Sequence, residues 1–339
     1  MVDLVLVTGA AGYVGSHVTH QLLSQGYLVR AAVRSPARAQ QVRDAVLARG
    51  LDPGGLELVV ADLESDDGWA GAVEGVRTVM HIASPFPSAM PEHDDDVIVP
   101  ARDGTLRVLR HARDAGVSRV VFTSSFAAVG YSPKANEVWT EADWTDPAGE
   151  NTAYIRSKAV AERAAWDFIA REGGGLEFTS LVPVGIFGPT LDDHLSTSVK
   201  FIQSMLTGAV QKVVPQYFGV VDVRDVAAAH EAAMAPVAAG QRMLLVADGP
   251  SLSFLDMAHI LREGLGDAAA KVPTEEYGAD EVRALAETDP AMREVARRLG
   301  VRPQISNAKA KALLGWSPRP AAQTVLDTAR ALLGQPPGF

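Results

Sequence analysis

Short apolar runs alternate with longer stretches of helical periodicity along the first half of the chain. The runs are rich in valine and leucine, as buried strands are, and they lie at Val2–Thr8, Leu28–Val33, Leu56–Ala61, Thr78–Ala83 and Arg119–Thr123. Helical patterns over 12–25, 37–49, 99–115 and 152–171 separate or follow them. Strands that are apolar along their whole length and joined by helices indicate a parallel sheet covered on both faces. With right-handed crossovers, this order predicts a Rossmann-type, doubly wound α/β fold.

The regular alternation stops after about residue 185. Residues 189–216 mix polar residues and proline with a short helical pattern, 222–234 is typical of a helix, and Arg242–Ala247 of a late strand. The rest is mostly helical. We therefore expect a dinucleotide-binding domain at 1–185, with 217–250 returning to it, and a smaller, mostly helical substrate lobe formed by 186–216 and 251–339.

Composition narrows the classes of function. The chain has 339 residues, 47% hydrophobic and 21% charged, as ordinary folded proteins do. It has no cysteine, which excludes disulfides, thiolate metal sites and a cysteine nucleophile. Its net charge is −10, and an acidic surface binds nucleic acids poorly because such binding requires clustered lysine and arginine. No apolar run is long enough for a membrane helix, and the N-terminus does not resemble a secretory signal. We expect a cytoplasmic protein with no nucleic-acid or membrane partner, and a homodimer stays open.

Three glycines follow the first predicted strand directly. Gly9, Gly12 and Gly15 form the pattern G-x-x-G-x-x-G where the chain passes from strand to helix. Glycine lets a backbone turn sharply and approach a pyrophosphate, and the helix N-terminus then offers free N–H groups to it. The alternative is a merely tight turn. We predict that the dinucleotide phosphates bind at Gly9, Gly12, Tyr13, Val14 and Gly15.

The end of the second strand distinguishes between two cofactors. An NAD site favours an acidic residue there, to accept a hydrogen bond from the ribose 2′-hydroxyl. This chain instead has Arg34, with Arg38 one helical turn later, and both can pair with a 2′-phosphate. The alternative is two solvated arginines on a surface loop. The pattern favours NADP(H).

Two further strand ends offer cofactor contacts. Asp62 and Leu63 follow the third strand, where the adenine would lie, although Asp62 could equally cap a helix. Ala83 and Ser84 follow the fourth strand, and their small size lets the backbone pass close to the cofactor.

Tyr154 and Lys158 form the pattern Y-x-x-x-K on a predicted helix. A spacing of four places both side chains on one face, one turn apart. An ammonium group beside a phenol favours the phenolate, so we expect a lowered pKa for Tyr154. Such a tyrosine can donate a proton to a carbonyl that is being reduced. Ser124 and Ser125, at the end of the fifth strand, could bond the substrate oxygen or simply cap the strand end.

The segments TGAAGYVG, TSS, YIRSK and PVGIFGP together resemble the extended short-chain dehydrogenases/reductases over nearly the whole chain. VDVRDVAAAH and ALLGWSPRP are similar to the dihydroflavonol-reductase-like and aldehyde-reductase-like branch, whose members reduce aldehydes and ketones with NADPH. The resemblance implies a catalytic Ser125, Tyr154 and Lys158, with Ser124 as the alternative one residue earlier, and a Lys158 that also holds the nicotinamide ribose. It further implies cofactor contacts at Pro183, Val184, Ile186 and Ser198.

Two other functions remain open beside carbonyl reduction. A nucleotide-sugar epimerase or dehydratase with tightly bound NAD would need an acid after the second strand and basic residues for a diphosphate, yet 186–220 contains only Lys200 and Lys212. A protein that binds NADP without turnover would need no proton donor. We favour reduction of a small, apolar carbonyl substrate, because 186–216 has few basic residues beside abundant Phe, Leu, Val and Met. Phe86, Phe126, Phe187 and Phe201 are candidates either for its pocket or for the core.

No motif predicts a metal site. The histidines show no paired ligand spacing, and we expect His81, within the apolar fourth strand, to be packed rather than to act as a base. The acidic run at 92–96 is more typical of a helix start than of a metal ligand set. Asp222 and Asp225 are predicted to begin the helix at 222–234.

Overall fold

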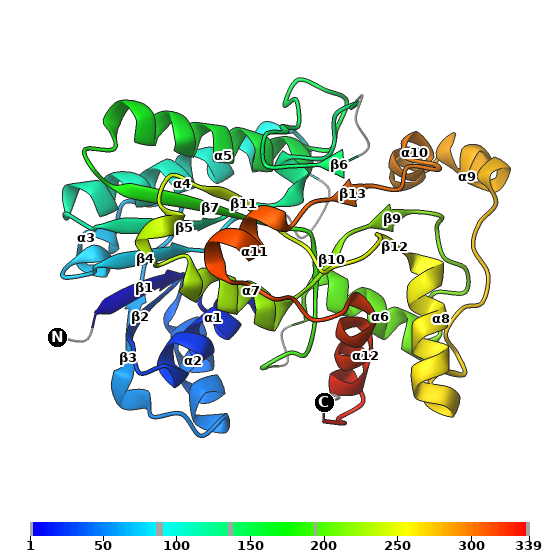
Figure 1. Cartoon of the computed structure of the whole chain (residues 1–339), viewed down its shortest axis with the longest axis horizontal. Helices are drawn as coiled ribbons and strands as arrows, with labels where there is room; N and C mark the ends of the chain where they lie inside the picture. The colour runs from blue at the N-terminus through cyan, green and yellow to red at the C-terminus, as the bar shows by residue number, and fades with distance from the viewer. Residues whose placement is uncertain (1–2, 86–90, 135–137, 193–194, 337–339) are drawn as a thin grey trace.

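A parallel sheet of seven strands runs through the molecule (Figure 1). The computed structural model describes residues 3–85, 91–134, 138–192 and 195–336. In spatial order the strands are β11 (Arg242–Leu245), β7 (Glu177–Pro183), β5 (Arg119–Thr123), β4 (Thr78–His81), β1 (Leu4–Thr8), β2 (Leu28–Val33) and β3 (Leu56–Val60). The order changes direction between β1 and β4, and ligands bind at the carboxyl ends of strands beside such a switch point. The predicted doubly wound fold is confirmed.

Helices cover both faces of this sheet because its strands are apolar on both sides. One face carries α1 (Tyr13–Ser24), α2 (Pro36–Ala48), α7 (Val223–Ala232) and α11 (Ala308–Leu314). The other carries α3 (Trp69–Val73), α4 (Asp95–Asp114) and α5 (Ala153–Glu172). Within β1, Val5 and Val7 join the core beneath α1 and α2, whereas Leu6 joins the core beneath α4. Neighbouring residues of a strand point to opposite faces, so one strand supplies both layers of the core around the sheet.

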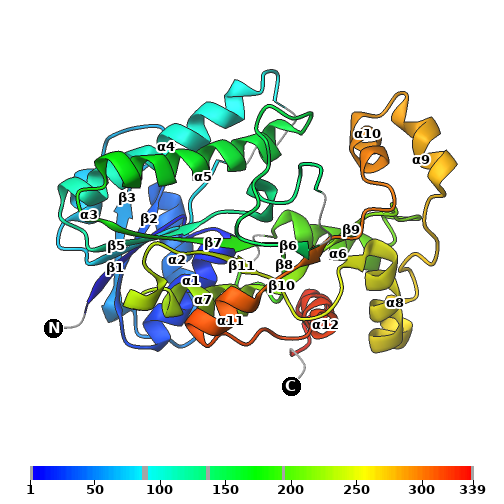
Figure 2. The ribbon, with the colours of Figure 1, turned by 45° about the horizontal axis from the view of Figure 1, so that its top comes forward.

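A second core lies beyond the carboxyl ends of the strands. It packs α6 (Thr197–Thr207), α8 (Phe254–Leu265) and α12 (Ala321–Leu332) against one another through Met205, Met257, Val325 and their neighbours. Figure 2 shows α8, α9 (Ala279–Ala286) and α10 (Pro290–Arg297) to one side of the sheet. Not all of the C-terminal part belongs to this second core. Ala310 of α11 (Ala308–Leu314) and Trp316 pack against the main sheet, whereas α12 lies in the second core.

Three short two-stranded sheets join the two parts. They pair β8 (Gly185–Phe187) with β10 (Val220–Asp222), β9 (Tyr217–Phe218) with β12 (Leu252–Ser253), and β6 (Val138–Trp139) with β13 (Gln304–Ile305). Among the helices within the described ranges, none is both long and apolar enough to cross a membrane.

The sequence did not predict β7 of the main sheet, the helix α3 or the short strands of the three two-stranded sheets. β7 contains Thr179 and Ser180, which interrupt an otherwise apolar run, yet both side chains are fully buried. Each has a partner that makes its burial tolerable: Thr179 donates to the carbonyl of Ala238 at 2.6 Å, and Ser180 donates to Glu162 at 2.6 Å. The helix expected at 99–115 begins earlier, with Asp95 and the rest of the acidic run at its start. The start of the first predicted strand, Val2, lies outside the described residues.

Candidate active site

The turn after β1 leaves no room for a side chain at Gly9 or at Gly15. Gly9 has a φ of +69°, and the Gly12 N–H donates to its carbonyl at 2.9 Å. A Cβ on Gly15 would lie 2.1 Å from the Gly9 carbonyl oxygen, and a Cβ on Gly9 would lie 2.9 Å from the Cα of Ala83. Gly12 is the N-cap of α1, so Tyr13, Val14 and Gly15 form its first turn. Bare backbone at a helix N-terminus fits a pyrophosphate.

A buried hydroxyl holds the end of β4 against this turn. Thr8 Oγ1 accepts the N–H groups of Ile82 and Ala83, both at 3.0 Å, and lies 2.9 Å from His81 Nδ1. With both lone pairs used, the hydroxyl proton of Thr8 goes to Nδ1, so the neutral imidazole carries its proton on Nε2. Burial, aided by the charge of Lys158, lowers the His81 pKa to about 3. His81 also packs on Phe122, with ring centroids 5.6 Å apart, and is therefore a packed residue, as expected, and not a base.

The two arginines expected to read the 2′-phosphate lie at the start of α2. Arg34 follows β2 directly and is exposed. Ser35 caps α2 by accepting the Arg38 N–H, and the Arg38 side chain, half-buried, donates to Gln41 at 3.0 Å. The cap therefore fixes the backbone between the two arginines. Because the Arg34 side chain is exposed, its guanidinium can turn toward a ligand.

Asp62 closes a local turn after β3. Its Oδ1 accepts the Glu64 N–H at 3.1 Å, and its carbonyl accepts the Trp69 Nε1–H at 2.8 Å. The alternative in which Asp62 caps a helix is wrong, because α3 begins after Gly68. The neighbouring Leu63 packs so closely on Gly104 of α4 that a Cβ there would lie 2.9 Å from the Leu63 Cβ.

Ser125, Tyr154 and Lys158 come together at the carboxyl edge of the sheet. Ser125 follows β5, accepts the Ala127 N–H at 3.2 Å, and shares a hydrogen bond with the side chain of Tyr154. Tyr154 and Lys158 occupy the first turns of α5, whose N-cap is Thr152. The Lys158 ammonium lies 5.5 Å from the centre of the Tyr154 ring and donates to Ser84 Oγ at 2.6 Å. Lys158 thus joins α5 to the end of β4.

The expectation of a lowered pKa for Tyr154 is wrong in this structure. Burial raises the pKa of Tyr154 above its ordinary value, the hydrogen bond from Ser125 opposes this in part, and Tyr131 adds to the increase. Burial also lowers the pKa of Lys158 to about 8. The spacing in the sequence indicated that the two side chains are close, but it did not indicate that both are buried. Desolvation of the charged form makes the largest contribution to the pKa shift of each group.

Ser124 points away from Tyr154 into the protein. It is 5% exposed, and its Oγ donates to Glu162 at 2.7 Å. Sequence reasoning missed Glu162, and its partner Arg242, entirely. The available signal was the spacing of Glu162, four residues beyond Lys158 on the same face of α5.

The segment after β8 connects the glycine turn with the C-terminal helix. The Tyr13 hydroxyl donates to the Gly188 carbonyl at 2.8 Å, His17 Nε2 lies 2.9 Å from the Pro189 carbonyl oxygen, and the Gly188 N–H donates to Thr328 at 2.7 Å. Burial lowers the pKa of His17 to about 4, so it is neutral and donates from Nε2 to the Pro189 carbonyl.

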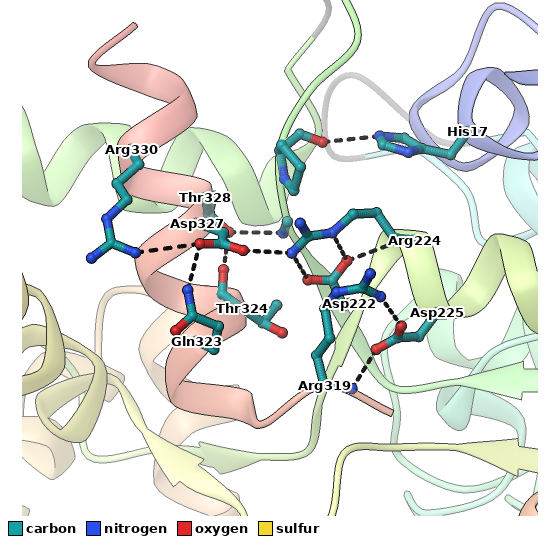
Figure 3. Close-up of polar contacts among 12 residues, drawn as sticks. His17, Asp222, Arg224, Asp225, Arg319, Gln323, Thr324, Asp327, Thr328 and Arg330 are labelled. Atoms are coloured by element: carbon teal, nitrogen blue, oxygen red, sulfur yellow. Dashed lines mark hydrogen bonds and ion pairs between the residues drawn. The ribbon is translucent and has the colours of Figure 1, made fainter. Parts of the chain in front are cut away.

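Figure 3 shows a charged cluster beside this segment. Arg224 donates to both oxygens of Asp222, at 2.8 and 2.7 Å, and to Asp327 of α12 at 2.7 Å. Both carboxylates are almost fully buried, at 0% and 1% exposed. Asp222 is the N-cap of α7 and Asp225 lies in its first turn, as predicted, and Asp225 also accepts the Arg319 N–H. The cluster ties α7 to α12.

The other residues implied by the resemblance lie near this edge of the sheet. Pro183 ends β7, Ile186 lies half-buried in β8, and Ser198 is half-buried in the first turn of α6. Phe187 is buried in the second core, and Phe201 packs on Phe254 with ring centroids 4.2 Å apart. Phe126 packs on Trp139, and Phe86 lies outside the described residues.

Comparison with known proteins gives consistent findings. Residues 5–246 match the profile of the NAD dependent epimerase/dehydratase family. The chain is 31% identical to the NADPH-dependent methylglyoxal reductase GRE2 of Saccharomyces cerevisiae over an alignment of 358 positions, which covers 97% of this chain and 98% of that protein. It is 36% identical to cinnamoyl-CoA reductase CAD2 of Medicago truncatula over 270 residues, and this alignment covers 77% of this chain and 80% of that protein. The crystal structure of yeast methylglyoxal/isovaleraldehyde reductase Gre2 complexed with NADPH is similar with a TM-score of 0.80, at 29% identity and 98% coverage of both chains.

Proposed function

This chain belongs to the NAD dependent epimerase/dehydratase family, and from that premise we propose that it is an NADPH-dependent oxidoreductase that converts small aldehydes or ketones to alcohols. The observation that carries the proposal is the hydrogen bond between Ser125 and Tyr154 with Lys158 one turn away. A protein that only binds the cofactor has no use for such a proton-donating set. The NADPH named for the yeast relatives supports the choice of cofactor.

The cofactor site that we propose follows the carboxyl edge of the sheet. The absence of any room for side chains at Gly9 and Gly15 fits the pyrophosphate. Arg34 and Arg38 would hold the 2′-phosphate, since Arg34 is exposed and no acidic residue directly follows β2, where it would repel the phosphate. The remaining contacts that we propose are Gly12, Tyr13 and Val14 for the phosphates, Asp62 and Leu63 for the adenine, Ala83, Ser84 and Lys158 for the ribose, and Pro183, Ile186 and Ser198 at the nicotinamide end.

NADPH, when bound, supplies the hydride for the carbonyl carbon. Ser125 donates a hydrogen bond that orients the substrate oxygen as negative charge develops on it. Tyr154 then protonates this oxygen, and its raised pKa keeps the phenol protonated and ready at neutral pH. Lys158 places a positive charge beside the resulting phenolate and stabilises it until a proton returns.

We propose that the substrate lobe comprises 186–216 and 251–307 with α12, and that it accepts an apolar, uncharged substrate. The second core of apolar helices supports this, as do the positions of the lysines at 186–220. Lys212 is paired with Glu281 at 2.7 Å on the surface, and Lys200 is exposed on α6. Neither position offers a buried cation that a sugar diphosphate would use.

Three variants test the mechanism. Tyr154→Phe should lose nearly all kcat, about 10²–10⁴-fold, with NADPH affinity retained, because a positioned acid contributes that much. Ser125→Ala should lose turnover with little change in cofactor binding, and Lys158→Ala should lose both. The measurement is NADPH titration beside steady-state reduction of simple aldehydes and ketones.

Tyr27→Phe is the matched control, since it removes the same hydroxyl just before β2, at the opposite edge of the sheet. A Tyr154→Phe enzyme that keeps more than about a tenth of wild-type kcat, with chemistry rate-limiting, contradicts proton donation by Tyr154. Faster turnover of sugar nucleotides than of simple carbonyl compounds would favour an epimerase or dehydratase. NADPH binding without any turnover would favour a non-catalytic protein.

A further inference from the structure

A buried carboxylate lies on the same face of α5 as the proposed catalytic side chains. Glu162 is one turn beyond Lys158 and two turns beyond Tyr154, and it is 0% exposed. Its Oε1 accepts from Ser180 at 2.6 Å and from Arg242 Nε at 2.7 Å. Its Oε2 accepts from Ser124 at 2.7 Å and from Arg242 Nη2 at 2.9 Å. Both oxygens are fully used, so the carboxylate has a single arrangement.

These contacts connect α5 to three strands of the sheet. Ser124 follows β5, Ser180 lies in β7, and Arg242 lies in β11. The Ser124 N–H also donates to the Leu181 carbonyl at 2.8 Å. The chain at Ser124 is therefore held from both its backbone and its side chain. Because Ser125 is the next residue, the position of its hydroxyl follows from these contacts.

Arg242 extends the same network to the segment beyond Ser125. Its guanidinium donates to the carbonyls of Glu141 and Asp143 at 3.0 and 2.6 Å, and lies 3.7 Å from the centre of the Trp144 ring. With Glu162 it forms a buried, bidentate ion pair whose donors and acceptors are paired. Such a pair contributes geometric definition more reliably than stability.

We propose that Glu162 is a positioning residue that, through Ser124, sets the separation of the Ser125 and Tyr154 hydroxyls. The inference rests on the proposed roles of those two residues. Glu162 does not touch the reacting atoms. It anchors the helix that carries Tyr154 to the strand end that carries Ser125, and a small displacement between reacting groups can reduce a rate about a hundredfold.

The serines that donate to Glu162 provide a matched pair for the test. Ser124→Ala and Ser180→Ala each remove one buried hydroxyl and one hydrogen bond to the same carboxylate, but only Ser124 adjoins Ser125. We expect Ser124→Ala to lower kcat per NADPH-binding site roughly tenfold or more, with the KM for NADPH unchanged within about twofold. Ser180→Ala should stay within about twofold of wild type in both. Glu162→Gln is less informative, because it would leave the buried guanidinium of Arg242 without its carboxylate.

A pH profile distinguishes positioning from a general loss of stability. The hydrogen bond with Ser125 lowers the pKa of Tyr154, whereas Tyr131, in the segment between Ser125 and α5, raises it. The substitution changes neither Tyr131 nor Lys158, whose ammonium lies 5.5 Å from the centre of the Tyr154 ring. Weakening that bond should therefore move the onset of alcohol oxidation, which requires the phenolate, to higher pH in Ser124→Ala and not in Ser180→Ala.

Each outcome of this experiment is decisive. Equal kcat values and equal pH profiles for the two serine variants, with similar melting temperatures, would overturn the inference while the proposed function stands. Wild-type protein that reduces no carbonyl compound, or Tyr154→Phe protein as active as wild type, would instead overturn the proposed function and the inference with it.

Discussion

At the scale of the residue, burial decides which polar side chains can carry chemistry. Among the residues that the structure describes, three histidines are buried, and burial lowers the pKa of His81 to about 3 and the pKa values of His17 and His230 to about 4. They are neutral at physiological pH and held by hydrogen bonds to Thr8, Pro189 and Thr123, respectively. The general acid that we propose is instead a tyrosine, Tyr154, whose pKa is raised by burial.

Arg34 shows the opposite case, an exposed charge available to a ligand. We predict that Arg34→Ala weakens NADPH binding roughly ten- to a hundredfold and leaves NADH binding nearly unchanged, because a hydrogen bond to a charged group contributes about 1.5–3 kcal/mol. Fluorescence titration with both cofactors measures this. Arg43→Ala, which removes an exposed arginine within α2, is the control and should change neither affinity. Equal losses for NADPH and NADH would show that Arg34 does not read the 2′-phosphate.

At the scale of the element, the unit formed by β1, the glycine turn and α1 depends on close approach of backbone to backbone. The three glycines do not contribute equally. A Cβ would lie 2.1 Å from the nearest atom at Gly15 but 3.2 Å at Gly12, and in both cases that atom is the Gly9 carbonyl oxygen. Backbone atoms cannot move aside as a flexible side chain can, so Gly15 is the position in this turn that tolerates an added side chain least.

We predict a graded loss of cofactor binding in alanine variants of this turn. Gly15→Ala should force the turn open and lower NADPH affinity more than about tenfold, or at least 1.4 kcal/mol, whereas Gly12→Ala should have a smaller effect. Gly71→Ala is the control, because Gly71 lies in α3 with nothing within 4 Å of an added Cβ. Titration with NADPH, beside circular dichroism to confirm folding, measures the series. NADPH affinity of Gly15→Ala equal to that of wild type would contradict the proposed phosphate site.

At the scale of the whole molecule, the two cores are joined by polar contacts between distant parts of the chain. Arg224 lies between Asp222 and Asp327, which are far apart in sequence. Burial favours a lower pKa for Arg224, but the hydrogen bonds and charges of the two carboxylates outweigh it and raise the pKa. The guanidinium thus stays charged and holds the N-terminus of α7 against α12 (Figure 3).

We predict that Arg224→Met lowers the free energy of unfolding by about 3–5 kcal/mol, since it leaves the buried carboxylate of Asp222 without its cation and removes a cation at 2.7 Å from buried Asp327, which keeps Arg330 at 3.5 Å. Urea denaturation followed by circular dichroism measures the change. Arg283→Met is the control: it breaks the exposed pair with Asp280, and exposed pairs contribute about 0–1 kcal/mol. Equal effects of the two substitutions would mean that the Arg224 cluster does not support the joined structure.

Much of the sheet and most of the candidate site follow from local patterns. The alternation of apolar runs and helical segments predicted β1 to β5 and α1, and the confirmed fold class with them. The glycines and the spacing of Tyr154 and Lys158 are local as well, because one turn of backbone decides which side chains share a face. Within the seven-stranded sheet, β7 is the exception, and it was missed because its polar residues Thr179 and Ser180 are paired with groups remote in sequence.

The sequence alone therefore determined the fold class, the family resemblance and the residues at the carboxyl edge of the sheet, since each depends on the order and spacing of neighbouring residues. Only the tertiary structure decided that Ser125 meets Tyr154 while Ser124 turns to Glu162, that Arg242 completes that carboxylate, and that burial raises the pKa of Tyr154. The physical reason is that hydrogen bonding and desolvation act through space. They depend on which strand ends and helices meet, and the spacing of residues within one segment carries no record of that.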